Sequence, residues 1–304
     1  MNPDVDLNDV EAREYIALLF DGYEKRKKEK KLYKHDNVPE IIIKTYYTYV
    51  KKPSFDRLLY NFKRRYLYNE NKMEQVHSIE EQKGLSCVYD YVNKRKDVEN
   101  ISIYDLSYIH EALYSKAKHP EFGGRYRNQD IYLLSEDDGI INGGNVELCP
   151  YWNITHEMNL LRPEVAELVK SGIRLGQNSD PNEILKYIND CVILKCKLIK
   201  IHPFRDGNGR SIRAFINLLF KLANIPPVYI ENKEKYKYQE AMNNALVLND
   251  YTDIFDFYNF KICDSIMALD LAVKNDISFN DYEESKNKVK VRNEFIITYL
   301  LCTL

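Results

Sequence analysis

The feature that most restricts the fold is a pair of amphipathic segments on either side of residues 202–210, HPFRDGNGR. Both segments repeat apolar residues every three or four positions, a spacing that aligns them on one face of an α-helix. The two stripes are Ile184, Ile188, Val192, Cys196 and Ile199 before the loop, and Ile212, Phe215, Ile216, Leu219 and Leu222 after it. Proline in NIPP, residues 224–227, is expected to end the second helix. The polar loop is therefore predicted to form the corner of a helix–loop–helix unit.

Most of the remaining chain also favours helices. Only 11 of 304 residues are glycine, and helical spacing recurs over residues 10–30, 53–82 and 82–95. A further helix is expected after Asp105, a candidate N-cap. These patterns predict an all-α fold, with an N-terminal helical extension ahead of the corner.

Residues 122–152 depart from this pattern. They hold five of the eleven glycines, a DDG turn signal at 137–139 and the β-prone run IYLL at 131–134. Such a combination is typical of a hairpin. We therefore expect a short β-hairpin flap within an otherwise helical chain.

The overall charge does not favour a nucleic-acid or membrane partner. The 44 basic and 46 acidic residues give a net charge of −2, so an anion must be bound by a local cluster. No run of 18 apolar residues and no signal-peptide pattern occurs. Six cysteines without CxxC spacing are typical of reduced thiols. We expect a cytoplasmic protein, while export by a route that needs no apolar signal stays open.

Two glycines and two arginines make the loop suited to bind phosphates. Gly207 and Gly209 allow backbone conformations closed to other residues, and they precede a helix whose first N–H groups and dipole attract an anion. Arg210 and Arg213 lie three apart on one helix face, where paired hydrogen bonds would hold further phosphate oxygens. Together these residues predict a polyphosphate site.

An aspartate and a histidine in the same loop are suited to metal binding and proton transfer. Asp206, beside phosphates, is suited to hold Mg²⁺. His202, with an ordinary pKa of about 6.5, is suited to accept a hydroxyl proton near neutral pH. Each feature alone is more often structural, as a helix-end histidine or a solvated arginine pair. Their occurrence within twelve residues favours a site where a hydroxyl attacks a phosphate of a nucleotide.

Residues 202–213, HPFRDGNGRSIR, match the signature HxFx[D/E]GNGRxxR, and in this the chain resembles the Fic family. The similarity extends to LSYIHEAL at 106–113, GGRYRNQDI at 123–131, VELCPYWNITHEMNLL at 146–161 and KYQEAMNNALVLND at 237–250. The resemblance implies a Fic-type helical bundle. It also implies AMPylation, the transfer of AMP from Mg·ATP to a Ser, Thr or Tyr hydroxyl of a target protein, with release of pyrophosphate.

The resemblance also assigns roles to the motif residues. His202 would be the general base, Phe204 the anchor of the loop in the core, and Asp206 the ligand of Mg²⁺. The anion hole around the α-phosphate would consist of Gly207, Asn208 and Gly209. Because kinase-like relatives carry a bulkier residue in place of the first glycine, Gly207 favours nucleotidyl transfer.

Two arginines and a tyrosine would complete the nucleotide site. By resemblance, Arg210 would hold the β- and γ-phosphates, and Arg213 would hold the γ-phosphate and set the orientation of the nucleotide. Tyr238 is the candidate for contact with the adenine base. The alignment of the stretch around it with the family can shift by one residue.

Upstream, YNENKMEQVHS at 68–78 resembles the inhibitory helix of many Fic proteins, whose pattern is [S/T]xxxE[G/N]. By this match Glu74 would pair with Arg213 and compete with the γ-phosphate. Glu70 and Gln75 stand where the pattern has Ser/Thr and Gly/Asn. The alternative is that Glu74 is a solvated residue of a charged helix.

These observations give an expected organisation. Residues 1–104 would form the N-terminal helical region, with the inhibitory helix at about 66–80. A Fic domain would follow over residues 105–265, and a C-terminal helical tail over 266–304.

The leading expectation for function is an autoinhibited protein adenylyltransferase that uses ATP and Mg²⁺, modifies a protein hydroxyl and also modifies itself. One alternative is removal of AMP from a modified protein at the same site. Another is a non-catalytic, antitoxin-like module that only binds nucleotide. A homo-oligomer is compatible with the apolar C-terminal end.

Overall fold

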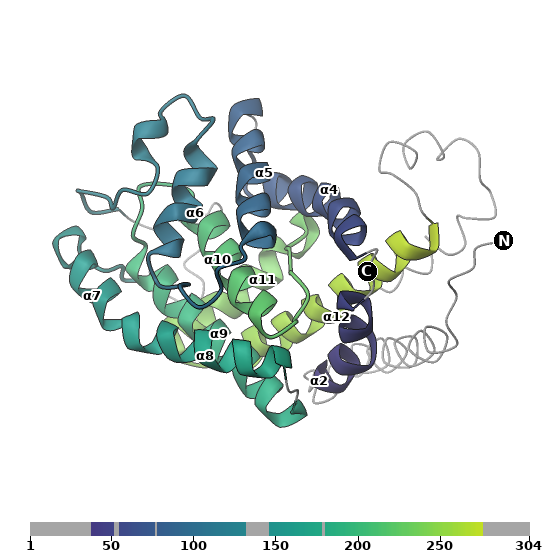
Figure 1. Cartoon of the computed structure of the whole chain (residues 1–304). Coiled ribbons are helices and arrows are strands. Elements are labelled where there is room, and N and C mark those ends of the chain that lie inside the picture. The colour runs from purple at the N-terminus through teal and green to yellow at the C-terminus, as the bar shows by residue number, and fades with distance from the viewer. Residues whose placement is uncertain (1–37, 52–54, 77, 132–145, 178–179, 276–304) are drawn as a thin grey trace.

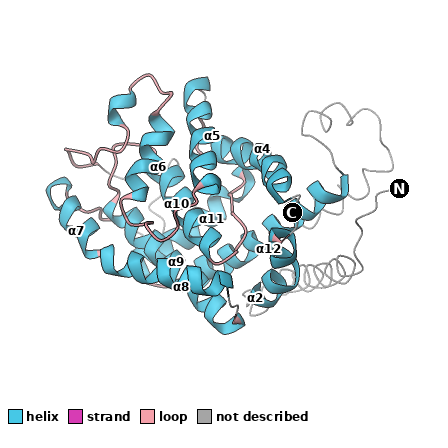
Figure 2. Cartoon of the chain, viewed as in Figure 1, coloured by secondary structure: helices cyan, strands magenta, loops and turns pink. Residues whose placement is uncertain are grey.

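The computed structural model describes residues 38–51, 55–76, 78–131, 146–177 and 180–275. Helices and loops account for all of them, and no strand occurs within these ranges (Figure 2). The predicted all-α fold is therefore confirmed. The hairpin flap was expected within residues 122–152. Residues 132–145 of this range lie outside the described residues, and the described parts, 122–131 and 146–152, contain no strand.

The helices follow one another with short connections. The first half of the chain contains α2 (Val38–Ile41), the π-helix η1 (Ile42–Tyr46), α3 (Tyr47–Val50), α4 (Phe55–Met73), α5 (Ile79–Lys94), α6 (Asp105–Tyr114) and the 3₁₀ turn η2 (Pro120–Phe122). The second half contains η4 (Tyr151–Asn153), α7 (Ile154–Leu160), α8 (Arg162–Gln177), α9 (Pro181–Ile201), α10 (Asn208–Leu222), η5 (Asn232–Glu234), α11 (Lys235–Asn243), η6 (Asn244–Leu248) and α12 (Thr252–Asn275). Asp105 is the first residue of α6 and Tyr104 its N-cap, one position from the predicted arrangement.

Helix α10 runs through the middle of the molecule, surrounded by α5, α6, α8 and α9 (Figure 1). Of its 15 residues, only Gly209 and Lys221 are not buried. A helix buried on every side cannot tilt without disturbing several neighbours. The arginines that α10 carries are therefore held on a rigid element.

The predicted helix–loop–helix corner is confirmed. Asp180 caps the start of α9 by accepting hydrogen bonds from two backbone N–H groups, at 2.8 and 3.2 Å, and Pro181 occupies the first turn. The helix ends at His202, and α10 begins after Gly207. Both flanking residues have the left-handed conformation, with φ of 47° and 74°. These two reversals bring the ends of α9 and α10 to the same loop.

Helices α4 and α5 form a hairpin with a tightly capped turn. The N–H of Val76 donates to the Asn71 carbonyl at 2.9 Å, and the N–H of Gln75 donates to the Lys72 carbonyl at 3.2 Å. This is the Schellman pattern, in which Glu74 is the C-cap residue. Ser78 then caps α5. The segment expected as one inhibitory helix, about 66–80, is thus the end of α4, a turn and the start of α5.

Gln75 has φ of 54°, the left-handed conformation that glycine or asparagine adopts most readily. Because a side chain costs about 1–2 kcal/mol there, Gln75→Gly is expected to raise the free energy of unfolding by about 1 kcal/mol, and the midpoint of thermal unfolding by a few degrees. Circular dichroism melts would measure this. Gln75→Ala, which keeps the Cβ atom, is the control; equal melting of the two variants would contradict the explanation.

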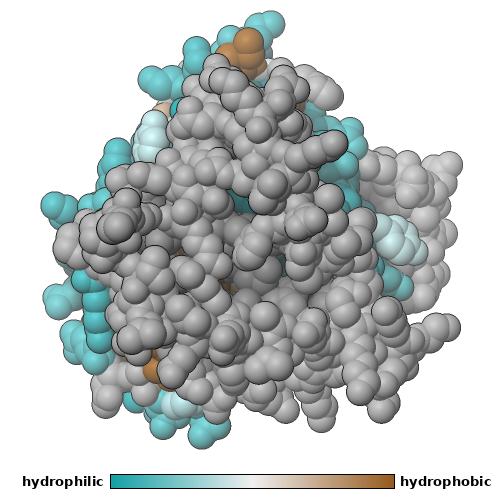
Figure 3. Space-filling view, turned by 90° about the vertical axis from the view of Figure 1, so that its right-hand side faces the viewer, coloured by the Kyte–Doolittle hydropathy of each residue, from teal (hydrophilic) through white to brown (hydrophobic). Residues whose placement is uncertain are grey.

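Figure 3 shows one face of the molecule, on which part of the described surface is visible. The described residues visible in Figure 3 are mostly hydrophilic, with isolated hydrophobic ones. Within the described ranges no helix has the length and apolar character needed to cross a membrane. Five cysteines lie in these ranges, and all are free thiols, as predicted.

Candidate active site

His202 is held at the end of α9 by Arg127, a residue that sequence reasoning did not assign. The Arg127 Nε donates to the His202 carbonyl at 2.9 Å, and the Arg127 backbone N–H donates to the Pro203 carbonyl at 2.9 Å. The same guanidinium donates to the Cys149 carbonyl. Arg127 thereby fixes the left-handed backbone of the histidine. It also connects two segments that are apart in sequence, around residues 127 and 149, to the loop.

The surroundings of His202 keep its imidazole neutral. Burial lowers its pKa from 6.5 to about 4, and the nearby Arg127 acts in the same direction. Asp206 and Glu74 oppose this shift but do not outweigh it. A neutral imidazole at pH 7 is able to accept a proton.

Phe204 is fully buried and stacks on His110, with ring centroids 3.8 Å apart. The Nδ1 atom of His110 accepts a hydrogen bond from the Gly124 N–H at 2.9 Å. The proton must then be on Nε2, which donates to the Asp206 carbonyl at 2.9 Å. Burial lowers the pKa of His110 to about 4, so at neutral pH the ring is uncharged and Nδ1 keeps the lone pair that accepts from Gly124. His110 lies in the LSYIHEAL stretch, yet its contact with the loop was not predicted.

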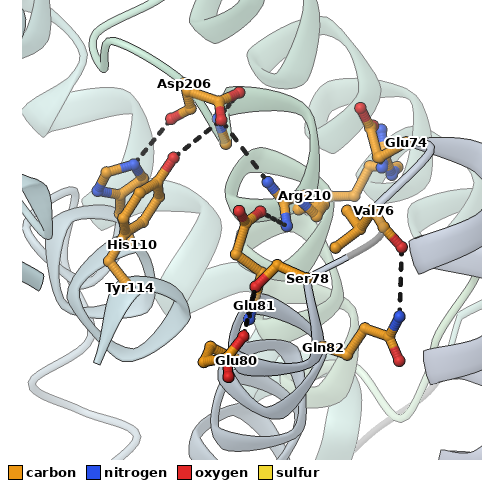
Figure 4. Close-up of polar contacts among 12 residues, drawn as sticks. Glu74, Val76, Ser78, Glu80, Glu81, Gln82, His110, Tyr114, Asp206 and Arg210 are labelled. Atoms are coloured by element: carbon orange, nitrogen blue, oxygen red, sulfur yellow. Dashed lines mark hydrogen bonds and ion pairs between the residues drawn. The ribbon is translucent and has the colours of Figure 1, made fainter. Parts of the chain in front are cut away.

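The carboxylate of Asp206 projects from the loop and is 73% exposed. The Tyr114 hydroxyl donates to Oδ2 at 3.0 Å, and the Gly207 N–H donates to Oδ1 at 2.6 Å (Figure 4). Two short hydrogen bonds orient the group, while its exposure leaves lone pairs for a cation. A single oriented carboxylate beside a phosphate site fits Mg²⁺, which takes one or two protein carboxylates together with phosphate oxygens.

The loop leads into a helix start that no side chain caps. The first N–H groups of α10 lack partners within the helix, so they remain available to an anion. At Gly207 a Cβ atom would lie 3.0 Å from Leu113 and 3.1 Å from Tyr114, in addition to the strain of φ 74°. Glycine is therefore required at this position.

The side chain of Asn208 closes the loop on itself. Its side-chain oxygen accepts from the Phe204 N–H at 2.9 Å, and its side-chain nitrogen donates to the Phe204 carbonyl at 2.8 Å. The side chain therefore closes the loop. Only the backbone N–H of Asn208 remains for a phosphate.

Both arginines of the motif are buried and paired with carboxylates from the α4–α5 hairpin. Glu81 lies 3.3 Å from the Nη1 of Arg210 (Figure 4). The Nη2 of Arg213 lies 2.5 Å from Glu74 and 2.8 Å from Glu70. The predicted contact of Glu74 with Arg213 is therefore present. The contacts of Glu70 and Glu81 were not predicted.

The ion pair of Glu74 with Arg213 goes with shifted pKa values of both partners. Burial alone would raise the pKa of Glu74, but Arg213, Arg210 and Lys235 together lower it below 4.5. Burial acts to lower the pKa of Arg213, whereas Glu70 and Glu74 raise it well above its usual value. Glu74 and Arg213 are therefore both charged at neutral pH.

Residues 100–220 match the model of the Fic/DOC family. Over these residues the chain is similar to a Fic/DOC domain. It is 30% identical over 179 residues to "Protein adenylyltransferase Fic" of Nematostella vectensis, covering 58% of this chain and 36% of the relative. A second relative of the same name, from Culex quinquefasciatus, is 26% identical over 164 residues, 53% of this chain and 28% of the relative. The chain thus spans about a third of the length of these relatives.

Solved structures agree in fold. Fic-1 of C. elegans, residues 134–508, superposes with a TM-score of 0.60 at 18% identity, over 79% of this chain and 73% of that one. A Fic-domain signalling protein from Bacteroides thetaiotaomicron gives 0.61 at 16% identity, over 78% and 97%. The arrangement of the helices is therefore a Fic fold.

The matched Fic/DOC region contains the whole loop but not the hairpin that faces it. Glu70, Glu74 and Glu81 all precede residue 100. The paired carboxylates thus come from outside the matched region, and they meet its two arginines.

Tyr238 also lies beyond the matched Fic/DOC region, on α11. Its ring is buried, with the Lys195 Nζ 4.5 Å from its centroid and the Phe257 ring 5.5 Å away. These are core contacts. A role at the adenine side stays a prediction.

Proposed function

We propose that the chain is an autoinhibited protein adenylyltransferase that moves AMP from Mg·ATP to a Ser, Thr or Tyr hydroxyl of a target protein. The observation that carries the proposal is a neutral, half-buried His202 fixed beside an uncapped helix start that bears two buried arginines. The name of the curated relatives points to the same reaction. Self-modification, self-association and a cytoplasmic location are further parts of the proposal.

In this reaction His202 would accept the proton as the target hydroxyl attacks the α-phosphorus. A bond forms between the hydroxyl oxygen and phosphorus, and the bond from phosphorus to the α–β bridging oxygen breaks. The first N–H groups of α10 would hold the α-phosphate oxygens. Arg210 and Arg213 would hold the pyrophosphate that leaves with the electron pair.

Asp206 would hold Mg²⁺, which supplies charge neutralisation for the leaving pyrophosphate. His110 and Tyr114 would keep the loop and its carboxylate in place for this purpose. The described residues contain no cluster of three His, Cys, Asp or Glu side chains, so the remaining ligands would be phosphate oxygens and water.

Transfer of label from ATP separates this reaction from phosphate transfer. Incubation with cell lysate and Mg²⁺ is expected to label protein from α-labelled ATP and not from γ-labelled ATP, with loss of the signal in EDTA. Label from the γ-position would contradict the proposal. Parallel α-labelled GTP, CTP and UTP would establish the base preference.

The position of Glu74 favours a second candidate, removal of AMP from a modified protein. A Cβ atom on Gly209 would lie 2.7 Å from Glu74 Oε1, so this carboxylate reaches the start of α10, where it could orient an attacking water. Self-modified Glu74→Gly protein, freed of ATP, is a suitable substrate. Release of AMP on addition of wild-type protein would support this candidate, and stable label would exclude it for that substrate.

A further inference from the structure

Arg213 has two carboxylate partners in different settings. Glu74 is the C-cap residue of α4 and its side chain is 30% exposed. Glu70 lies one turn earlier within the helix, and its side chain is 0% exposed. Only Glu74 is at an exposed helix end, where local opening requires little disruption.

Glu70 is fixed through both of its oxygens. Its Oε2 accepts from the Arg213 Nε at 2.8 Å and lies 2.8 Å from Nη2. Its Oε1 accepts from the Ile230 N–H at 3.2 Å, in the segment between α10 and α11. If the Glu70 carboxylate left this position, the buried charge of Arg213 would lose a partner and the buried N–H of Ile230 would lose its acceptor. Glu70 therefore stays on Arg213 when Glu74 leaves.

The charges at this point have a direct consequence for a phosphate. With both carboxylates in place, one positive charge faces two negative charges. When Glu74 leaves, Glu70 still neutralises Arg213 and still occupies Nε and part of Nη2. A terminal phosphate would then meet a neutral ion pair in place of a bare guanidinium.

We infer that Glu70 is a specificity-determining residue, which lowers the preference of the site for a third phosphate by partly neutralising Arg213. This inference rests on the proposed function, because it takes Arg213 as the partner of the γ-phosphate. Glu70 stands where the inhibitory pattern has Ser or Thr, neither of which carries a charge.

The ratio of ATP to ADP affinity tests this inference, since the two nucleotides differ only in the γ-phosphate. Both proteins that are compared carry Glu74→Gly and His202→Ala. In them Glu74 no longer competes with the γ-phosphate, and ATP is not consumed. Adding Glu70→Gln is expected to raise the ratio about tenfold in calorimetry, the order given by removing a unit charge several ångströms from a phosphate at an effective dielectric of about 20. A ratio that stays the same or falls would overturn the inference.

Matched variants separate charge from packing. Glu234→Gln removes another buried carboxylate, which accepts from Lys261 at 2.9 Å, and is expected to leave the ratio unchanged. Glu70→Asp keeps the negative charge, so the ATP/ADP affinity ratio is expected to stay near the parent value. A rise of this ratio equal to that caused by Glu70→Gln would refute a charge effect. If Glu70→Gln does not fold, Glu70→Ser takes its place.

The inference and the proposed function fail in different ways. If Glu74→Gly transfers AMP but the ATP/ADP ratio does not respond to Glu70, only the inference is lost. If Glu74→Gly neither binds ATP nor transfers AMP, the proposed function is lost with it.

Discussion

Replacing Glu74 by glycine is expected to raise AMP transfer about ten- to a hundredfold, both to target proteins and to the chain itself. The reason is competition, because the carboxylate of Glu74 occupies a donor of Arg213 that the γ-phosphate would need in the proposed reaction. A hydrogen bond to a charged group contributes about 1.5–3 kcal/mol, which corresponds to this range of rates. Initial rates with α-labelled ATP would measure the change.

Two variants on the same hairpin make this result specific. Glu74→Gln keeps the shape of the side chain without its charge and is expected to give a smaller rise. Glu80→Gln removes a carboxylate whose hydrogen bond is to Ser78, and is expected to change nothing. If Glu74→Gly leaves both the rate and the affinity for ATP as in wild type, Glu74 is not a brake.

His202→Ala is expected to lower AMP transfer about 10²- to 10⁴-fold in the Glu74→Gly background, the usual contribution of a general base. Affinity for ATP is expected to persist, because the helix start and both arginines do not depend on the imidazole. Single-turnover rates and calorimetry on the same preparations would measure the two properties. Equal transfer with and without His202 would refute the mechanism, and cellular effects that persist without transfer would favour a non-catalytic module.

The pH dependence of the released enzyme follows from the pKa of His202. A general base acts in its unprotonated form, which predominates above its pKa of about 4. Transfer is therefore expected to be independent of this group between pH 6 and 8, and to fall as the pH approaches about 4. The same group affects stability, because its pKa is lower in the folded state than its ordinary value. Folding stability contributed by the neutral ring is present above about pH 6.5 and is lost as pH falls towards 4.

The helices and the loop were predictable because their signals are local. Apolar spacing, Asp180 with Pro181, and the glycines of the motif act within a few residues of chain, and the corner formed where these signals placed it. Glu70 and Arg213, in contrast, are 143 residues apart, and nothing in the spacing around either residue indicates the other. The contacts of Arg127 and His110 with the loop also join residues far apart in the sequence, so the spacing around them does not predict these contacts.

Gln75 and Asn208 both act through local backbone geometry that residue type alone does not reveal. Gln75 was taken as a departure from the inhibitory pattern, yet it adopts the left-handed conformation that the usual Gly or Asn provides. Position 75 therefore has the backbone conformation expected of the pattern, although its residue is neither Gly nor Asn. The place of Asn208 in an anion hole stays a prediction for its backbone N–H, and its side-chain amide, two atoms from the backbone, closes the loop.

The capped turn after α4 connects the activity of the enzyme with its local stability. Since α10 is packed on all sides, Arg213 cannot move away from Glu74, and release must come from the hairpin. The hydrogen bonds at Gln75 and Val76 that close the turn would break in that event. Under the proposed function, basal activity would follow how often the C-terminal end of α4 opens, and the backbone conformation of Gln75 would contribute to that equilibrium.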